Sequence, residues 1–335
     1  MSEFDLRIEV EKTEYNGGDT LSGVLHVQSP KDYTAKAVTV GLGWYTHGFG
    51  NGDHGEVSSA LLHSGRIIAG RAYAFPFSLE IPNGPVTFRG NLVNVEWELS
   101  ARADIPWKID PKAEFEIYVT EPNTGELYVP GTPLDELPAW RAQPNSASGG
   151  AWLLFILPFL LFGLFALYSA ITQFDLFWLI FALGFLLLPG FILFRGLKNT
   201  FAEKRIGEVQ MEVPARLSPG GLCPIQVAFT PKSSGYLNEI RATLTCQEHA
   251  TAGSGTNRRT RTHEIAKIEK TSATQQRLMP GQRVESELEF ELPADAVLSF
   301  YGGDNKVKWT VEVRVDIPGW PDWVETRDVC VVPAT

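Results

Sequence analysis

Residues 93–106, VNVEWELSARADIP, return nearly unchanged in pattern as residues 305–318, NKVKWTVEVRVDIP. Trp97 and Trp309 stand 212 positions apart, and each stretch ends in Asp-Ile-Pro. Within both stretches apolar and polar residues alternate, as they do along a strand that buries one face. A constant offset with the apolar positions in phase predicts two copies of one domain.

The same alternation continues on both sides of residues 93–106. Further short strands are predicted in the first copy at Phe4–Val10, Leu21–Val27, Ala37–Leu42, Ala72–Ile81 and Phe115–Val119. The glycine-rich segment Thr46–Glu56 is interpreted as a long loop. Because short strands follow one another with turn residues between them and no helical periodicity, we expect a β-sandwich.

The second copy extends the repeat upstream with a smaller offset. Gly18 pairs with Gly220, and Val38 pairs with Ile240, at an offset of 202. We assign the difference to a longer loop at Gln247–Thr262 in the second copy. The predicted domains are one sandwich over residues 1–120 and a second over residues 206–333.

Several motifs in these copies resemble the arrestin family. They are Gly18-Asp19-Thr20-Leu21-Ser22-Gly23, Phe75-Pro76-Phe77-Ser78-Leu79-Glu80-Ile81-Pro82, Phe88-Arg89-Gly90 and Val95-Glu96-Trp97-Glu98-Leu99. Motifs similar to the last three follow in the second copy. The resemblance implies an all-β protein with two tandem arrestin-like, immunoglobulin-like β-sandwiches. Arrestins join their domains by a short linker, whereas here a long apolar segment separates them.

That apolar segment predicts a transmembrane helical hairpin over residues 151–195, which a proline-rich linker at residues 121–150 precedes. Its two runs, residues 151–170 and 174–194, contain Asp175 as their only charge. About 20 residues of helix span roughly 30 Å, the thickness of a bilayer's hydrocarbon core. The alternative is a pair of buried helices in a soluble core, which would need neighbours covering them on all sides. In the membrane interpretation, Gly163, Ala166 and Ala170 form a small-residue stripe against which the second helix packs.

The flanking charges predict the orientation of this hairpin. Four basic residues follow it, and the turn between its helices carries only Asp175; the four are Arg195, Lys198, Lys204 and Arg205. By the positive-inside rule, an integral membrane protein with both termini and both sandwiches in the cytoplasm is expected. The start of the chain lacks a signal-peptide pattern, and the odd number of cysteines, three, fits a reducing compartment.

The charge balance argues against binding to nucleic acid, because the chain carries a net charge of −10. Residues 1–150 hold 11 Lys and Arg against 20 Asp and Glu, so the acidity belongs to the first half. His47, Asp53, His54 and His63 could ligate zinc, but their spacing matches no structural zinc pattern and also suits a solvated loop. No motif indicates a nucleophile, a paired-carboxylate centre or a phosphate cradle. We therefore assign no catalytic, cofactor-binding or metal residues.

The densest basic group is Arg258, Arg259 and Arg261. It is the candidate contact for anionic lipid or for an acidic protein partner, and the alternative is a solvated hairpin tip. The expected function is a non-catalytic, membrane-anchored, arrestin-like adaptor or scaffold that binds a protein partner of unknown identity. Two alternatives stay open: an accessory subunit whose hairpin packs into a larger membrane complex, and a membrane-tethered enzyme.

Overall fold

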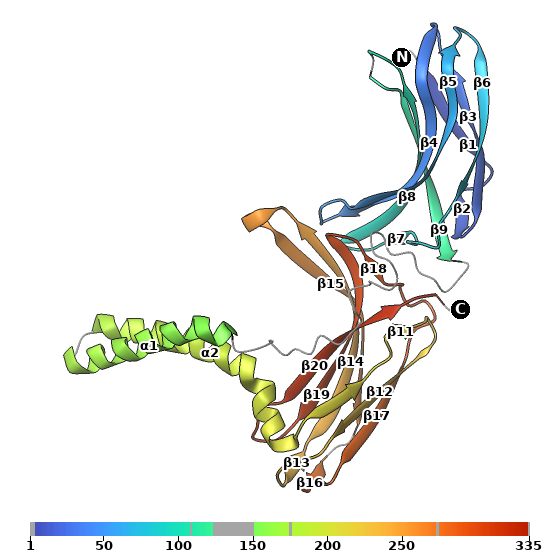
Figure 1. The fold of residues 1–335 in the computed structure, drawn as a ribbon. Helices are drawn as coiled ribbons and strands as arrows, with labels where there is room; N and C mark the ends of the chain where they lie inside the picture. The colour runs from blue at the N-terminus through green and yellow to red at the C-terminus, as the bar shows by residue number, and fades with distance from the viewer. Residues whose placement is uncertain (1–3, 108, 123–150, 174–175, 273–274, 334–335) are drawn as a thin grey trace.

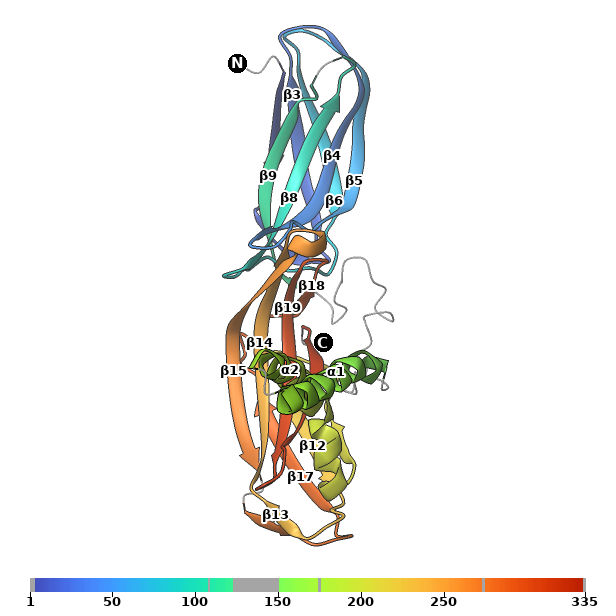
Figure 2. The ribbon, with the colours of Figure 1, turned by 90° about the vertical axis from the view of Figure 1, so that its left-hand side faces the viewer.

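The chain forms two β-sandwiches stacked end to end, with a helical hairpin that projects sideways from the second (Figures 1 and 2). The computed structural model describes residues 4–107, 109–122, 151–173, 176–272 and 275–333. The predicted proline-rich linker at 121–150 lies outside the described residues from position 123 onward. Strands dominate both sandwiches, as the alternating sequence pattern predicts.

The first sandwich packs a sheet ordered β1-β3-β6 against a larger sheet ordered β2-β9-β8-β4-β5, in which β7 also pairs with β8. Its strands are β1 (Asp5–Val10), β2 (Glu14–Gly17), β3 (Thr20–Gln28), β4 (Tyr33–Gly48), β5 (His54–Ile67), β6 (Ala72–Glu80), β7 (Phe88–Arg89), β8 (Val93–Asp104) and β9 (Lys112–Pro122). The long loop expected at Thr46–Glu56 is wrong at both ends, because β4 runs to Gly48 and β5 begins at His54.

The second sandwich repeats this plan with sheets ordered β10-β12-β17 and β11-β20-β19-β14-β15, and with β18 paired to β19. A small sheet of β13 and β16 lies at its far end (Figure 1). Its strands are β10 (Val209–Glu212), β11 (Arg216–Leu217), β12 (Leu222–Phe229), β13 (Gly235–Leu237), β14 (Glu239–Ala252), β15 (Arg259–Ser272), β16 (Gln276–Leu278), β17 (Val284–Glu291), β18 (Phe300–Tyr301), β19 (Asn305–Asp316) and β20 (Trp323–Val331). The segment interpreted as a longer loop, Gln247–Thr262, is mostly strand, since β14 and β15 pair through it with only a short turn at 253–258.

Strand register confirms the internal repeat. Trp97 lies opposite Ile117 and Trp309 lies opposite Val329, so both partners keep the offset of 212. Each indole N–H donates to the backbone carbonyl oxygen twelve residues earlier, at 2.8 Å in both copies. Both tryptophans are almost fully buried. The equivalent register and the equivalent hydrogen bonds show that the two sandwiches are copies of one domain plan.

The apolar runs form two helices, α1 (Ala151–Gln173) and α2 (Leu176–Ile206). The small-residue stripe predicted for the first helix is confirmed as its packing face, because Ala166 and Ala170 are buried. A Cβ atom added at Gly163 would lie 2.8 Å from the side chain of Leu186, so the second helix leaves no room for a side chain at this position.

The transmembrane assignment of this hairpin is wrong. Among the described residues, neither helix combines the length and the apolar content that crossing a membrane requires. α2 is longer than the apolar run, since it continues through a charged last third, and α1 ends in polar residues. The orientation deduced from the flanking charges, with both termini and both sandwiches cytoplasmic, depended on this assignment and is wrong for the same reason.

The last turns of α2 belong to the second sandwich. Ala202 and Ile206 are fully buried in its core, and the backbone carbonyl of Arg205 accepts a hydrogen bond from the N–H of Lys232 at 2.8 Å. The guanidinium of Arg205 lies 5.7 Å from the ring centre of Trp320. The segment after the apolar runs, which carries the four basic residues, is therefore helix anchored in the sandwich.

Candidate functional site

The two sandwiches meet at a joint built around a buried carboxylate of the second sandwich. Glu248, on β14, is 1% exposed. Its carboxylate oxygens accept hydrogen bonds from the backbone N–H groups of Asn91 at 2.9 Å, Leu92, and Val93 at 3.1 Å, all in the first sandwich. A buried carboxylate is tolerated when several backbone N–H groups converge on it, as they do here. Glu248 therefore ties the start of β8 to the second sandwich.

A second carboxylate makes the reciprocal contact from the first sandwich. Asp53 accepts hydrogen bonds from the backbone N–H groups of Asp304 at 3.1 Å and Asn305 at 3.0 Å. The side-chain amide of Asn305 also donates to Asp53 at 2.8 Å and to Thr46 at 2.9 Å, and Asn305 is 1% exposed. Each sandwich thus supplies an acceptor for backbone donors of the other.

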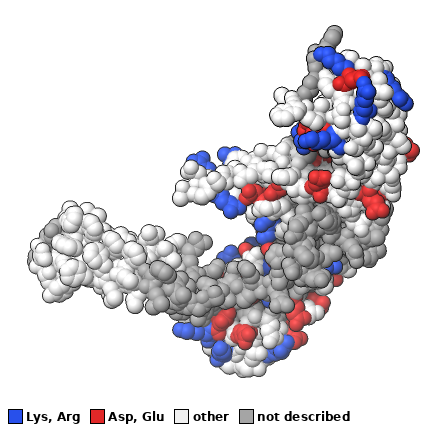
Figure 3. Space-filling view, turned by 45° about the horizontal axis from the view of Figure 1, so that its top comes forward, with Lys and Arg blue, Asp and Glu red and all other residues white. Residues whose placement is uncertain are grey.

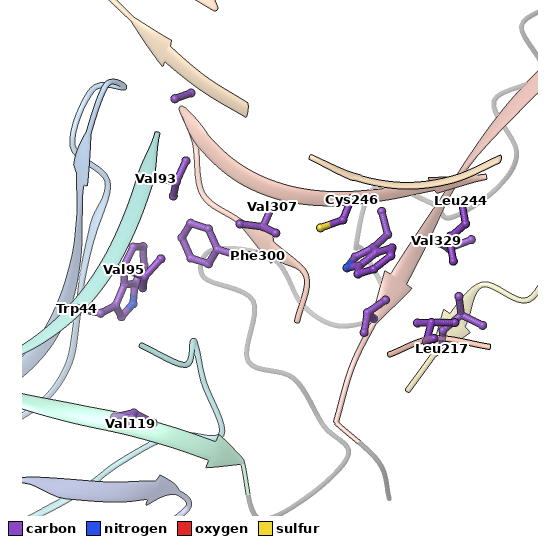
Figure 4. Packing of buried hydrophobic residues seen from close by; sticks show 14 of the residues in the cluster. Trp44, Val93, Val95, Val119, Leu217, Leu244, Cys246, Phe300, Val307 and Val329 are labelled. Atoms are coloured by element: carbon purple, nitrogen blue, oxygen red, sulfur yellow. The ribbon is translucent and has the colours of Figure 1, made fainter. Parts of the chain in front are cut away.

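Apolar contact accompanies these polar contacts. The rings of Trp44, on β4, and Phe300, on β18, meet edge to face with centroids 5.8 Å apart. Figure 4 shows Val95 on the side of the first sandwich and Val307 on the side of the second, so buried residues continue across the joint. The joint is a packed interface, in which aromatic contact and hydrogen bonds act together.

Two of the three arginines predicted as a contact site lie at this joint. Arg258 pairs with the carboxylate of Asp304 at 2.6 Å. The guanidinium of Arg261 lies 4.1 Å from the ring centre of Phe49, in the first sandwich. Arg259 is exposed at the start of β15, and within the described part of the chain it makes no ion pair. The assignment of the three to anionic lipid or an acidic partner stays a prediction.

The residues considered as zinc ligands do not converge. Asp53 is engaged by donors of the second sandwich, and Nε2 of His47 lies 3.1 Å from a carboxylate oxygen of Glu96. Glu96 also accepts a hydrogen bond from the hydroxyl of Tyr45 at 2.9 Å. Burial, together with that hydrogen bond, raises the pKa of Tyr45 to about 12. Across the described ranges, no group of three His, Cys, Asp or Glu side chains is placed to hold a metal ion.

The cysteines are free and buried in the second sandwich. Burial raises the pKa of the Cys223 and Cys330 thiols to about 11 and, with the nearby charge of Glu248, that of Cys246 to about 12. Because the thiolate is the reactive form, these cysteines serve as core residues and not as nucleophiles.

Sequence reasoning missed Glu248, although the sequence carries a signal for it. Along β14 the buried face holds Ile240, Ala242, Leu244 and Cys246, and Glu248 follows in the same phase. A carboxylate at an apolar-phase position of a strand must find donors, because burying an unpaired charge is costly. The identity of those donors, backbone groups of the other sandwich, is not readable from the sequence.

No family model and no curated protein matches this chain. Among solved structures, the crystal structure of Spo0M, a sporulation control protein from Bacillus subtilis, matches with 13% sequence identity and a TM-score of 0.33. The match covers 70% of this chain and 69% of that one. A similarity of this size assigns no function.

Proposed function

We propose that the protein is a non-catalytic, arrestin-like adaptor or scaffold whose two sandwiches bind a partner protein as one unit. The fold consists of two β-sandwiches in tandem, and the sequence motifs resemble those of arrestins. β-Sandwich folds host many functions, so the proposal depends on the joint and not on the fold alone.

The observation that carries the proposal is the buried Glu248 at the joint. Three backbone N–H groups of the first sandwich converge on its carboxylate, and Asp53 makes the reciprocal contact. Two sandwiches on a mobile linker would need neither contact. A fixed relative orientation lets surfaces from both sandwiches act on one partner at a low entropic cost, since preorganised surfaces lose less freedom on binding.

The test is capture of partners from native extracts with the full chain, followed by chemical crosslinking and mass spectrometry. The variant Glu248→Gln disturbs the joint, because it introduces an NH2 group, a hydrogen-bond donor, where the backbone N–H groups of the first sandwich need an acceptor. The matched control is Glu264→Gln, which removes a carboxylate that is exposed on β15. We expect the control to keep the partners and Glu248→Gln to lose those that contact both sandwiches.

Two results would contradict this function. If the Glu248→Gln variant captured every partner that the unsubstituted protein captures, partner binding would not depend on the fixed orientation. Turnover of a substrate by the purified full chain, lost on a single polar substitution, would show that the protein is an enzyme.

A second function, accessory subunit of a larger assembly, is favoured by the surface of the hairpin. Figure 3 shows the described part of the hairpin without Lys, Arg, Asp or Glu on the side that faces the viewer. Large apolar side chains are exposed along both helices, among them Leu157, Phe159, Leu161, Leu164, Phe165, Leu176, Phe177, Ile180, Leu187 and Leu188. Contiguous apolar surface of this kind marks an interaction site in many proteins. Replacing the hairpin by an unrelated helical hairpin distinguishes the two functions, because an adaptor keeps its partners and an accessory subunit loses them.

A further inference from the structure

The exposed face of the larger sheet in the first sandwich contains a hollow. Gly41 and Gly43, on β4, place no side chain on this face, and the cross-strand neighbours of Gly41 are Ser59 and Ser100. A Cβ atom at Gly41 would meet its nearest neighbour, the Ser100 hydroxyl, at 3.6 Å, so a side chain at this position would fit without a clash at its first atom. The hollow has a volume of about 500 Å³. It lies on the opposite side of the sheet from the core residues Leu42 and Trp44.

Three carboxylates line this hollow. They are Glu56, Glu98 and Glu114, on three different strands. In the described chain none of the three forms an ion pair. By contrast, Arg89 pairs with Glu116 at 2.8 Å elsewhere on the same sheet. Lys112 lines one end of the hollow.

The lining cations do not balance these carboxylates. Arg102, which also lines the hollow, is already paired with Asp110, which leaves Lys112 to oppose three carboxylates. Burial first, and then the negative charges of Glu114 and Glu116, raise the pKa of Glu98, and the opposing charge of Lys112 does not cancel the rise. A cation placed in the hollow would relieve this repulsion, whereas an anion would add to it.

We infer that this hollow docks a lysine- or arginine-bearing segment of a partner protein. The inference rests on the proposed binding function and adds the chemistry of the partner. Charge complementarity selects a basic segment, and the hollow beside Gly41, with a volume of about 500 Å³, leaves room for the stem of a lysine or arginine. The acidic first half of the chain supports the same choice, because its field attracts basic partners.

The test measures the affinity of the full chain for fluorescein-labelled octalysine by fluorescence anisotropy at low salt. The double variant Glu98→Gln/Glu114→Gln removes two carboxylates of the hollow. The matched control Glu289→Gln/Glu291→Gln makes the same change in net charge on exposed positions of β17. The variant Gly41→Val fills the hollow without altering charge, and circular dichroism verifies that each variant is folded.

We expect Glu98→Gln/Glu114→Gln to raise the Kd roughly three- to tenfold, in line with two partly exposed ion pairs. The control should change the Kd less than twofold, and Gly41→Val should weaken binding like the double variant. Equal weakening by the double variant and its control would show attraction to the whole acidic protein and would overturn the inference. Binding that Gly41→Val leaves unchanged would also overturn it. Either result leaves the proposed function to the partner-capture experiment, which does not depend on this hollow.

Discussion

The carboxylate of Glu248 in the second sandwich lies 3.1 Å from the backbone nitrogen of Val93 in the first. Val93 opens the stretch VNVEWELSARADIP, whose repeat defines the two domains. The start of β8 is thus both the beginning of the repeated motif and the part of the first sandwich that is held by the second. The joint therefore acts directly on the central strand of the larger sheet.

Substitution of Glu248 by Ala should destabilise the joint strongly. The change leaves the N–H groups of Asn91, Leu92 and Val93 without their acceptor, and an unsatisfied donor that is buried, as that of Val93 is, costs about 1–3 kcal/mol. We expect a loss of at least about 2 kcal/mol in the free energy of unfolding, measured by chemical denaturation. Spin labels on the two sandwiches should show a broadened distance distribution in the variant. A distribution as narrow as that of the unsubstituted protein would mean that other contacts hold the orientation.

Arg261 and Arg259 offer a matched pair for testing the arginines of the second sandwich. Arg261→Ala removes a cation–π contact with Phe49 across the joint, and we expect it to cost about 0.5–1 kcal/mol. Arg259→Ala removes an exposed side chain and should change stability by less than about 0.5 kcal/mol. Denaturant titration measures the free energy of unfolding of both variants. Equal losses for the two would argue against a role of Arg261 in the joint.

The two equivalent tryptophans should be equally important for their sandwiches. Trp97→Ala and Trp309→Ala each empty a fully buried site, at an expected cost of about 3–5 kcal/mol. Trp107→Ala is the control, because that side chain is fully exposed and should be nearly neutral. Thermal unfolding of the three variants provides the comparison. A small effect at only one of the buried tryptophans would show that the copies differ in how their cores are packed.

The sandwiches were predictable because both of their patterns, the alternation along each strand and the repeat between the two copies, are visible in the sequence. Alternation with a period of two marks the buried face of each strand, and the 212-residue offset places Trp97 and Trp309 at equivalent positions without any structure. The extent of the longest strands was not predictable in this way. β4 and β5 continue into a glycine-rich segment that has weak strand propensity, because pairing with neighbouring strands supplies the hydrogen bonds there.

The hairpin and the joint show where sequence patterns stop being sufficient. The length of the apolar runs suggested membrane helices, yet α2 ends only at Ile206, where it is packed in the second sandwich. Gly207 follows in the left-handed conformation (φ +80°) and its N–H donates to the carbonyl of Glu203 at 2.9 Å, so a local glycine stop ends the helix and the burial of Ile206 anchors that end. The joint depends on backbone donors near Val93 and on Glu248, which are 155 residues apart, and no local pattern links them.

Glu98 should make the protein less stable at neutral pH than a neutral side chain in its place. Burial and the neighbouring charges of Glu114 and Glu116 raise its pKa above the ordinary value of 4.5. The folded state therefore binds the Glu98 proton more tightly than the unfolded state does. Below pH 4.5 Glu98 is protonated in both states and costs no stability. As the pH rises through its folded-state pKa, Glu98 ionises and the free energy of unfolding falls.

Glu98→Gln removes that loss, because glutamine is neutral at every pH. We expect a higher melting temperature than that of the unsubstituted protein at pH 7, with the difference shrinking as the pH falls to 4. Glu289→Gln, at an exposed position of β17, is the control and should show no such trend. Melting temperatures across this pH range test the prediction, and a Glu98→Gln variant less stable at pH 7 would refute it. If Glu98→Gln stabilises the protein, then Glu98 lowers the stability of the folded state. Such a cost is expected of a residue at the hollow whose role is binding.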